Sequence, residues 1–383
     1  MNYEKKLPVE LPKPTGTYAI GTITYSLIDK SRKEIYSHDS KHPFRELVMQ
    51  IWYPATLKGN ETPAPYISSS LKLHIQEVLE KKEPFLFGGS GYIEADVTTH
   101  TFLNTIVNDK EVKYPVIVFS HGFGGPRYLY TNLFEELASH GYIVVSFNHT
   151  YTSEPTEFPD GRIIRASSEW AQFVKNKDEL EKAHNLEIIT WIADLQFVLD
   201  QLTLINRQDT QNKLTNKLDL NHIGIMGHSF GGAAATSLCR IDPRCKAGVN
   251  MDGPLFGQNQ DIGFNKPFMF LFAEPFKVPV GHSNENYYNM VIKKNEEQLT
   301  KLYDNLTNDV YYIVLKDADH MSFSDWNLIT EVNKTEKINP QEAVFLTRNL
   351  LVNFFDKYLK GKPLSVLATL THKKEIEVKY KLK

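Results

Sequence analysis

A serine lies between two glycines in the segment Gly227-His228-Ser229-Phe230-Gly231, and Gly232 follows it. An apolar run at 223–226 precedes this segment, and a helix-prone run of small residues at 233–239 comes after it. A serine at a sharp strand-to-helix turn is held in a strained backbone conformation, and glycines at the flanking positions avoid a clash across the turn. The pattern therefore predicts a nucleophile elbow that presents the hydroxyl of Ser229.

A serine hydroxyl is a weak nucleophile at neutral pH, so it needs a histidine base, which in turn needs an orienting carboxylate. When the serine sits on such an elbow, the order along the chain is serine, acid, histidine. His320 follows the last apolar run that is typical of a buried strand, so we expect it to be the base. The alternatives are a surface histidine or a metal ligand beside Asp317 and Asp319, but no second His or Cys nearby completes a metal site.

Two carboxylates are candidates for the acid. Asp252 directly follows the apolar run at 247–251, and Glu274 directly follows the next run at 267–273. Both positions lie at the expected end of a strand after the elbow. The residues alone leave both possibilities open.

A glycine-rich segment, His121-Gly122-Phe123-Gly124-Gly125, follows the apolar run at 115–120 and is called the 121–125 loop below. Attack on an ester carbonyl places negative charge on its oxygen, and two backbone N–H groups must already point at that position. We expect these groups to belong to Phe123 and Phe230. We interpret His121 and His228 as packing or positioning residues, because they precede or adjoin the serine.

The apolar runs and the helical periodicity indicate how these residues are held. A strand at 115–120, a helix at 128–140 and a strand at 142–147 have the spacing of a right-handed crossover between parallel strands. We therefore predict an α/β fold with a mostly parallel central sheet. Its further strands lie at 223–226, 247–251, 267–273 and 310–315, and its further helices at 168–206, 287–306 and 340–359.

The segments that flank this core are less regular. Runs at 18–29 and 46–53 are rich in β-branched and aromatic residues and predict two antiparallel edge strands, the second ending at Pro54. Residues 56–112 predict an insertion near the mouth of the site, with a helix at 70–81 and a glycine-rich break at 88–91. The alternating tail at 375–380 predicts a small edge strand. We expect a single domain over residues 1–383.

Composition narrows the possible partners. The net charge is −3 and the basic residues are scattered, so we expect no nucleic-acid partner. The sequence contains no run of about 18 apolar residues, so we expect no transmembrane span. The N-terminus lacks an apolar signal core, so we expect either a cytoplasmic protein or a secreted one whose signal has been removed. We expect Cys239 and Cys245 to be two reduced thiols, with a local disulfide as the alternative.

The chain resembles the platelet-activating factor acetylhydrolase family of the plasma and type II class, within the α/β-hydrolase superfamily. The matching segments are 11–16, 50–54, 120–130 and 227–232, together with the position of Asp252 after the serine. The resemblance implies a calcium-independent phospholipase A2 without a cofactor or metal. It also places the acid at Asp252 rather than Glu274, so that Ser229, Asp252 and His320 form the triad, with Phe123 and Phe230 as oxyanion donors.

The function that we expect is a serine ester hydrolase that releases short acyl groups, with a small-molecule ester or a phospholipid as substrate. The sn-2 acetyl group of platelet-activating factor and short oxidised chains of phospholipids are the leading candidates, and transient contact with a lipid surface is compatible with them. The alternatives are a general carboxylesterase, a polyester or dienelactone hydrolase, and a catalytically dead binding module. A peptidase is less favoured, since no propeller-like repeat accompanies the hydrolase core.

Overall fold

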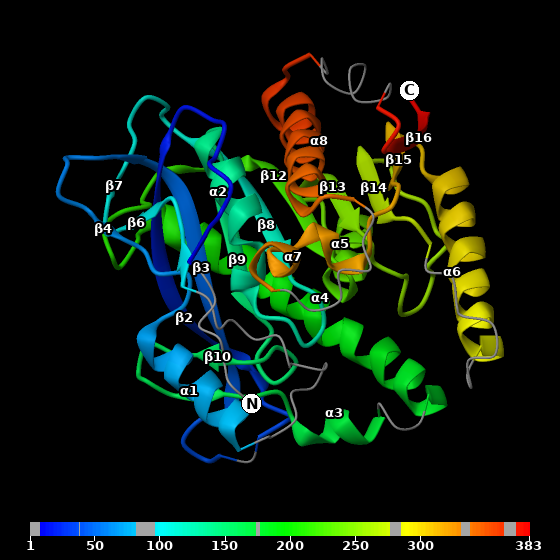
Figure 1. Ribbon diagram of the computed structural model, residues 1–383, viewed down its shortest axis with the longest axis horizontal. Helices are drawn as coiled ribbons and strands as arrows, with labels where there is room; N and C mark the ends of the chain where they lie inside the picture. The colour runs from blue at the N-terminus through cyan, green and yellow to red at the C-terminus, as the bar shows by residue number, and fades with distance from the viewer. Residues whose placement is uncertain are drawn as a thin grey trace.

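The computed structural model describes residues 8–37, 39–81, 96–173, 177–275, 285–330, 338–363 and 373–383. Within these ranges, twelve strands form one central sheet that helices cover on both faces (Figure 1). Eleven of the strands follow one another in this order: β16 (Ile376–Lys381), β15 (Val310–Leu315), β14 (Phe268–Ala273), β13 (Cys245–Met251), β12 (Leu218–His228), β8 (Tyr114–Ser120), β9 (Ile143–Asn148), β3 (Phe44–Thr56), β2 (Ala19–Lys33), β6 (Thr101–Leu103) and β4 (Thr62–Pro63).

The middle of the sheet is parallel, as predicted. Strands β15, β14, β13, β12, β8 and β9 are paired in parallel with one another, in this order. The carboxyl ends of these strands therefore lie at one edge of the sheet, where active sites of open α/β sheets form. Strand β16 adds to β15 in antiparallel register, so the expected edge strand of the tail is confirmed.

The two N-terminal strands are antiparallel, as predicted, but they are not the last strands at this end of the sheet. β2 and β3 are antiparallel to each other, and β3 is antiparallel to β9, but β6 lies on the far side of β2 and β4 lies beyond β6. β6 and β4 come from the segment predicted as an insertion, which thus extends the sheet. β3 also continues past Pro54, whose carbonyl accepts a hydrogen bond from the Asn108 N–H.

Helices cover the sheet because side chains on successive strand residues point to opposite faces. In β8, Ile117 and Phe119 pack with the side chains of α2 and α8, whereas Val116 and Val118 pack with those of α4 and α5. The helices are α1 (Ser69–Glu80), α2 (Thr131–Ser139), α3 (Ser168–Phe173), α4 (Lys177–Arg207), α5 (Phe230–Ile241), α6 (Glu285–Asn305), α7 (Trp326–Ile329) and α8 (Pro340–Lys360), with 3-10 turns η1 (Arg127–Tyr130) and η2 (His320–Phe323).

Local sequence explains where α8 begins and ends. The Asn339 side chain accepts a hydrogen bond from the Gln341 N–H, and Pro340 occupies the first turn, where its missing N–H costs nothing. Gly361 ends the helix in the left-handed conformation with φ at 68°. The helix predicted at 168–206 is instead two helices, α3 and α4, and the one predicted at 128–140 begins with the 3-10 turn η1.

The described residues of the segment predicted as an insertion form α1 and four short strands, of which β7 (Ile106–Val107) pairs with β3. β5 (Val97–Thr98) pairs with β1 (Val9–Glu10) in a separate two-stranded sheet, as β10 (Thr156–Glu157) does with β11 (Ile163–Ile164). The glycine-rich break at 88–91 lies outside the described residues. That residues 1–383 form one domain stays a prediction.

The expectation of two reduced thiols is wrong, because Cys239 and Cys245 form a disulfide. Cys239 lies in the last turns of α5, and Cys245 is the first residue of β13. The connection between the two elements brings their Cα atoms to 5.2 Å, within the range that a disulfide spans. Sequence spacing could not reveal this, since it does not fix the angle between the helix and the strand.

One helical stretch of the described chain, Glu181–Arg207 within α4, is long and apolar enough to cross a membrane. This is weak support for a membrane span, because the core helix of a soluble protein passes the same test. Trp191, Leu195 and Val198 of this stretch are fully buried against the sheet.

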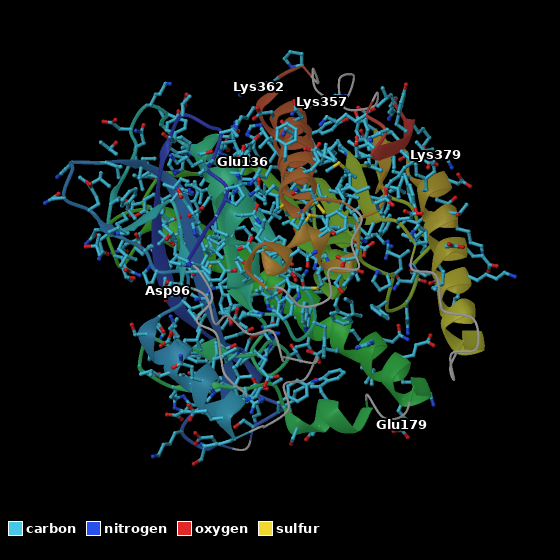
Figure 2. All side chains as sticks on the ribbon, viewed as in Figure 1. Asp96, Glu136, Glu179, Lys357, Lys362 and Lys379 are labelled. Carbon is cyan, nitrogen blue, oxygen red and sulfur yellow. A yellow bond between two sulfur atoms is a disulfide. The ribbon has the colours of Figure 1, made fainter. Side chains whose placement is uncertain are left out.

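Charged side chains lie mainly at the outside of the ribbon, as Lys362 and Lys379 do in Figure 2. Glu136 is an exception, since it is 3% exposed on α2. Its carboxylate lies 3.3 Å from the Arg348 guanidinium of α8, and this buried ion pair joins the two helices on that face of the sheet.

Candidate active site

Ser229 stands at a turn between β12 and α5 with backbone angles φ 56° and ψ −124°. This conformation is strained for a residue with a side chain, and such strain persists only where the surroundings hold it. The Ser229 N–H donates to the Met251 carbonyl oxygen at 2.8 Å, and its own carbonyl accepts from the Gly232 and Ala233 N–H groups. The geometry is that of the predicted nucleophile elbow.

The glycines of the pattern are required by close approach. A Cβ atom at Gly227 would lie 2.2 Å from the Gly231 carbonyl oxygen, and one at Gly231 would lie 2.1 Å from the Ser120 carbonyl oxygen. Any side chain at either position would thus force the strand, the turn or the neighbouring β8 to move. The serine is half-buried, so its hydroxyl lies at the surface of the site rather than in the core.

His320 and Asp252 lie together at the same edge of the sheet. His320 Nδ1 is 2.6 Å from Asp252 Oδ2, and the other carboxylate oxygen accepts from the Ala273 N–H at 3.1 Å. Both residues adjoin the serine turn. The His320 ring lies 4.5 Å from that of His228, which precedes Ser229, and a Cβ at Gly253, which follows Asp252, would lie 2.3 Å from the Ser229 carbonyl oxygen.

Asp252 and His320 shift each other's pKa in opposite directions. Burial acts to raise the pKa of Asp252, but the hydrogen bond and the charge of His320 outweigh it and lower the pKa overall. Loss of solvent acts to lower the pKa of His320, but the hydrogen bond and the charge of Asp252 outweigh this effect and raise it. The His320 side chain remains 47% exposed, so a substrate and water have access to its ring.

The other carboxylates near His320 make different contacts. Glu274 accepts a hydrogen bond from the Asp317 N–H at 3.0 Å, so the structure does not bring it to the histidine in the way that it brings Asp252. Asp319 caps the 3-10 turn that begins at His320, where it accepts from the Met321 N–H at 2.9 Å and from the Ser322 hydroxyl at 3.0 Å. Asp319 thus shapes the turn that carries the histidine.

The 121–125 loop lies against the serine turn. A Cβ at Gly122 would lie 3.3 Å from Ser229 Cβ, and the rings of Phe123 and Phe230 meet edge to face at 5.4 Å. Phe230 is the first residue of α5, and the first four N–H groups of a helix have no partner within it. The Phe230 N–H is therefore suited to donate a hydrogen bond to a negatively charged oxygen at this point.

Sequence reasoning did not find Tyr130, which connects the 121–125 loop to the turn that carries His320. The hydroxyl of Tyr130 accepts from the Gly122 N–H at 3.1 Å and lies 2.8 Å from His228 Nδ1, and His228 Nε2 lies 2.8 Å from the His320 carbonyl oxygen. Burial lowers the pKa of His228 to about 3, so its ring is neutral. Nε2–H donates to His320, and the Tyr130 hydroxyl donates to Nδ1. The interpretation of His228 as a positioning residue agrees with this bridge.

No group of three or more His, Cys, Asp or Glu side chains in the described part of the chain is arranged to hold a metal ion. The side chains that the structure brings together at this edge of the sheet are those of Asp252 and His320, beside the turn of Ser229.

A model of the family described as platelet-activating factor acetylhydrolase, isoform II, matches residues 4–364. The chain belongs to this family. It is 26% identical over 282 residues to platelet-activating factor acetylhydrolase of Gallus gallus, covering 65% of this chain and 63% of the relative. It is also 26% identical over 267 residues to a probable 1-alkyl-2-acetylglycerophosphocholine esterase of Arthroderma benhamiae, covering 66% and 61%. The chain thus spans less than two thirds of either relative's length.

Among solved structures, a ferulic acid esterase from Streptomyces cinnamoneus superimposes with a TM-score of 0.74 at 27% sequence identity. The superposition covers 97% of this chain and 99% of the esterase. The predicted α/β-hydrolase fold, with a mostly parallel sheet between helices, is therefore confirmed, and so is the family resemblance.

Proposed function

We propose that this chain is a serine ester hydrolase that releases short acyl groups. The observation that carries the proposal is the 2.6 Å contact between His320 Nδ1 and Asp252 beside the strained turn of Ser229. Family membership and the esterase fold support the same reaction class.

The residues act in the following order. Asp252 accepts the hydrogen bond from His320 Nδ1–H, so Nε2 is free to take a proton. Ser229 Oγ attacks the ester carbonyl carbon while its proton passes to His320 Nε2, and the carbonyl oxygen becomes an anion at the Phe123 and Phe230 N–H groups. The C–O bond to the alcohol then breaks, and the alcohol takes the proton from His320. Water repeats the sequence on the acyl-serine and releases the carboxylic acid.

Aromatic rings beside these N–H groups support a preference for short acyl chains. The Phe230 ring lies 4.8 Å from that of Trp191 and 5.1 Å from that of Phe256. Trp191 and Phe230 are both buried, so packed aromatic rings lie on this side of the serine turn, and we infer that they limit the length of the acyl chain. An acetyl group, as in the sn-2 position of platelet-activating factor, or a short oxidised chain fits this description.

The test is release of acetate from an sn-2 acetyl phosphatidylcholine in the presence of a calcium chelator. We expect the wild-type chain to release acetate and Ser229→Ala to lose on the order of 10⁴-fold or more in turnover. Ser237→Ala, which removes another buried hydroxyl from α5, serves as the matched control and should retain activity. Equal turnover of Ser229→Ala and the wild type would contradict the assignment.

A second candidate is a general carboxylesterase, which the likeness to the ferulic acid esterase favours. The two functions differ in the alcohol that they accept, not in the chemistry at Ser229. Hydrolysis of 4-nitrophenyl acetate without any release of acetate from the phospholipid would favour the second candidate and leave the serine assignment in place.

A further inference from the structure

A second set of serine, histidine and aspartate side chains is buried beneath the 121–125 loop. Ser120 Oγ lies 2.9 Å from His149 Nε2, and His149 Nδ1 lies 2.9 Å from Asp194 Oδ2. All three residues are 0% exposed, so no substrate reaches them. We call this set the second relay. It has the hydrogen-bond order of a catalytic triad but none of the access that a nucleophile needs.

The direction of its hydrogen bonds follows from the charges around it. Burial acts to raise the pKa of Asp194, but the charge of Arg45 outweighs it and keeps the carboxylate ionised. Burial lowers the pKa of His149 to about 4, so the ring carries one proton. A carboxylate only accepts hydrogen bonds, so that proton is on Nδ1, and Nε2 accepts from the Ser120 hydroxyl.

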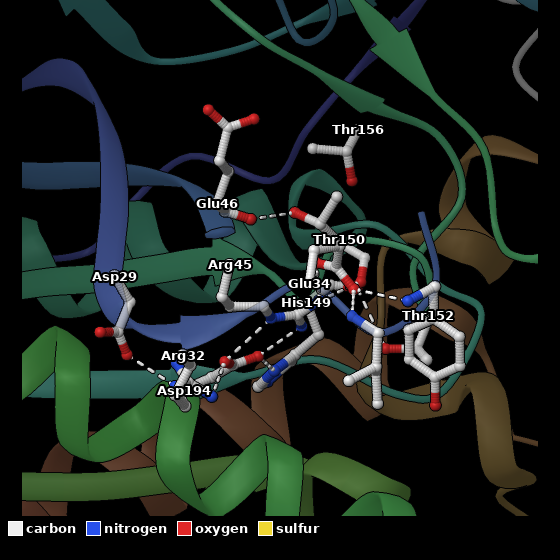
Figure 3. A network of polar contacts seen from close by, with 12 residues as sticks. Asp29, Arg32, Glu34, Arg45, Glu46, His149, Thr150, Thr152, Thr156 and Asp194 are labelled. Carbon is white, nitrogen blue, oxygen red and sulfur yellow. Dashed lines mark hydrogen bonds and ion pairs between the residues drawn. The ribbon is translucent and has the colours of Figure 1, made fainter. Parts of the chain in front are cut away.

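Two arginines hold the acidic end of the second relay, as Figure 3 shows. Arg45 Nη2 lies 2.7 Å from Asp194 Oδ2, and Arg32 Nη1 lies 2.8 Å from Oδ1. Arg45 Nη1 also donates to the Thr150 carbonyl at 2.7 Å. Asp194 is therefore fixed relative to the backbone that follows His149, and the His149 ring is further stacked on Trp191 at 3.7 Å.

The second relay is connected to the 121–125 loop on both sides of Phe123. On one side, the His149 N–H donates to His121 Nε2 at 3.1 Å, and His121 Nδ1 donates to the Gly122 carbonyl at 2.8 Å. On the other side, the Gly124 N–H donates to the Thr152 carbonyl at 2.8 Å, and the Thr152 N–H donates to the His149 carbonyl at 3.0 Å. Movement of His149 thus changes the position of both neighbours of Phe123.

We propose that Ser120, His149 and Asp194 are positioning residues that hold the Phe123 N–H where the oxyanion forms. The second relay performs no chemistry of its own. This role rests on the function proposed above, because it concerns an N–H group that stabilises the transition state of ester hydrolysis.

The experiment uses Ser120→Ala, which removes the hydroxyl that donates to His149 and leaves Nε2 without its partner. The matched control is Ser146→Ala on β9, since the Ser146 hydroxyl is also buried but has no hydrogen-bond partner among the described residues. Ser120→Thr restores a hydroxyl and serves as the rescue variant. If Ser120→Ala does not fold, Ser120→Cys replaces it, because a thiol is only a weak donor.

Four quantities are measured on each folded variant: kcat and KM for 4-nitrophenyl acetate, the Ki of an aryl trifluoromethyl ketone, and amide hydrogen exchange of a peptide covering the 121–125 loop. Loss of one oxyanion donor costs roughly 10²- to 10³-fold in kcat, so we expect a displaced donor to cost roughly tenfold or more. KM should stay within about twofold, because ground-state binding does not use the oxyanion contact. The Ki of the ketone, which forms an oxyanion on Ser229, should rise in parallel with the loss in kcat.

Hydrogen exchange separates this proposal from the proposed function, because it requires no activity. Faster exchange of the loop peptide in Ser120→Ala than in Ser146→Ala supports positioning even if the wild type hydrolyses no ester, a result that would overturn the proposed function alone. Unchanged exchange and unchanged kcat in folded Ser120→Ala or Ser120→Cys would overturn the positioning role. Equal losses of kcat in Ser120→Ala and Ser146→Ala would also overturn it, because they would indicate a general effect of buried hydroxyl removal.

Discussion

Asp252→Asn tests the acid assignment at a single atom. In the structure, Asp252 Oδ1 accepts from the Ala273 N–H at 3.1 Å and Oδ2 accepts from His320 Nδ1 at 2.6 Å, so both oxygens are acceptors. An asparagine has one oxygen and one NH₂ group at these two places. If its oxygen stays on the Ala273 N–H, its NH₂ faces Nδ1, and the neutral imidazole must then carry its proton on Nε2.

The alternative orientation places the NH₂ group against the Ala273 N–H, so that two donors face each other at about hydrogen-bond distance. Leaving a buried donor without an acceptor costs roughly 1 to 3 kcal/mol, so the first orientation is favoured. A histidine protonated on Nε2 cannot accept the proton of Ser229. We therefore expect kcat to fall by about 10⁴-fold, the size of effect that a wrong tautomer produces in a serine hydrolase.

The assay is turnover of 4-nitrophenyl acetate by folded protein, and Glu274→Gln is the matched control. Glu274 was the alternative acid in the sequence, and it accepts from the Asp317 N–H, a contact that the oxygen of glutamine can also make. Glu274→Gln should stay within about twofold of the parent. A loss of less than tenfold in Asp252→Asn, or a collapse of activity in Glu274→Gln, would refute the assignment of Asp252.

Three further predictions concern titration and stability. His320 must be neutral to act as a base, and its pKa is raised above 6.5. We therefore expect kcat/KM to fall as the pH drops through a midpoint above 6.5. A midpoint below 6.5 in the pH–rate profile would contradict the contact with Asp252. The disulfide joins residues six positions apart, so Cys239→Ala together with Cys245→Ala should lower the free energy of unfolding by about 2 kcal/mol in urea melts. Detection of free thiols in the native chain would show that the bond does not form. Arg45→Met removes a positive charge that neutralises the buried Asp194 carboxylate, so it should lower the free energy of unfolding by about 3 to 5 kcal/mol in the same melts. Lys294→Met, which breaks the exposed ion pair with Glu181, should lower it by less than about 1 kcal/mol. Equal losses in the two variants would contradict the stabilising role of the buried network.

The features that were predicted from sequence are those that local patterns determine. The elbow at Ser229 needs glycines wherever backbone approaches backbone, and buried parallel strands leave continuous apolar runs such as 115–120. The choice of Asp252 over Glu274 needed the family resemblance, because both carboxylates end strands that follow the elbow. Their different hydrogen-bond partners depend on the turns after β13 and β14, which no local pattern specifies.

The second relay was not predicted from the sequence, because its three residues are far apart in the chain. Ser120 and His149 are 29 residues apart, and His149 and Asp194 are 45 apart. A signal was nevertheless present, since Ser120 ends β8 and His149 directly follows β9, and adjacent parallel strands bring their carboxyl ends together. Asp194 had no such signal, because a buried carboxylate on a helix is recognised only when its arginine partners are known. The sequence also did not predict that β6 lies beyond β2, because a strand of only three residues is too short to leave a recognisable pattern.

The role of Ser229 as the nucleophile is tested most directly by the site at which a fluorophosphonate attaches to the folded chain, located by mass spectrometry of its peptides. We expect a single adduct on Ser229, absent from Ser229→Ala and formed much more slowly in His320→Ala. No adduct on the folded wild-type chain would contradict the assignment of the nucleophile. An adduct on Ser120 in place of Ser229 would contradict both that assignment and the buried, positioning role of the second relay.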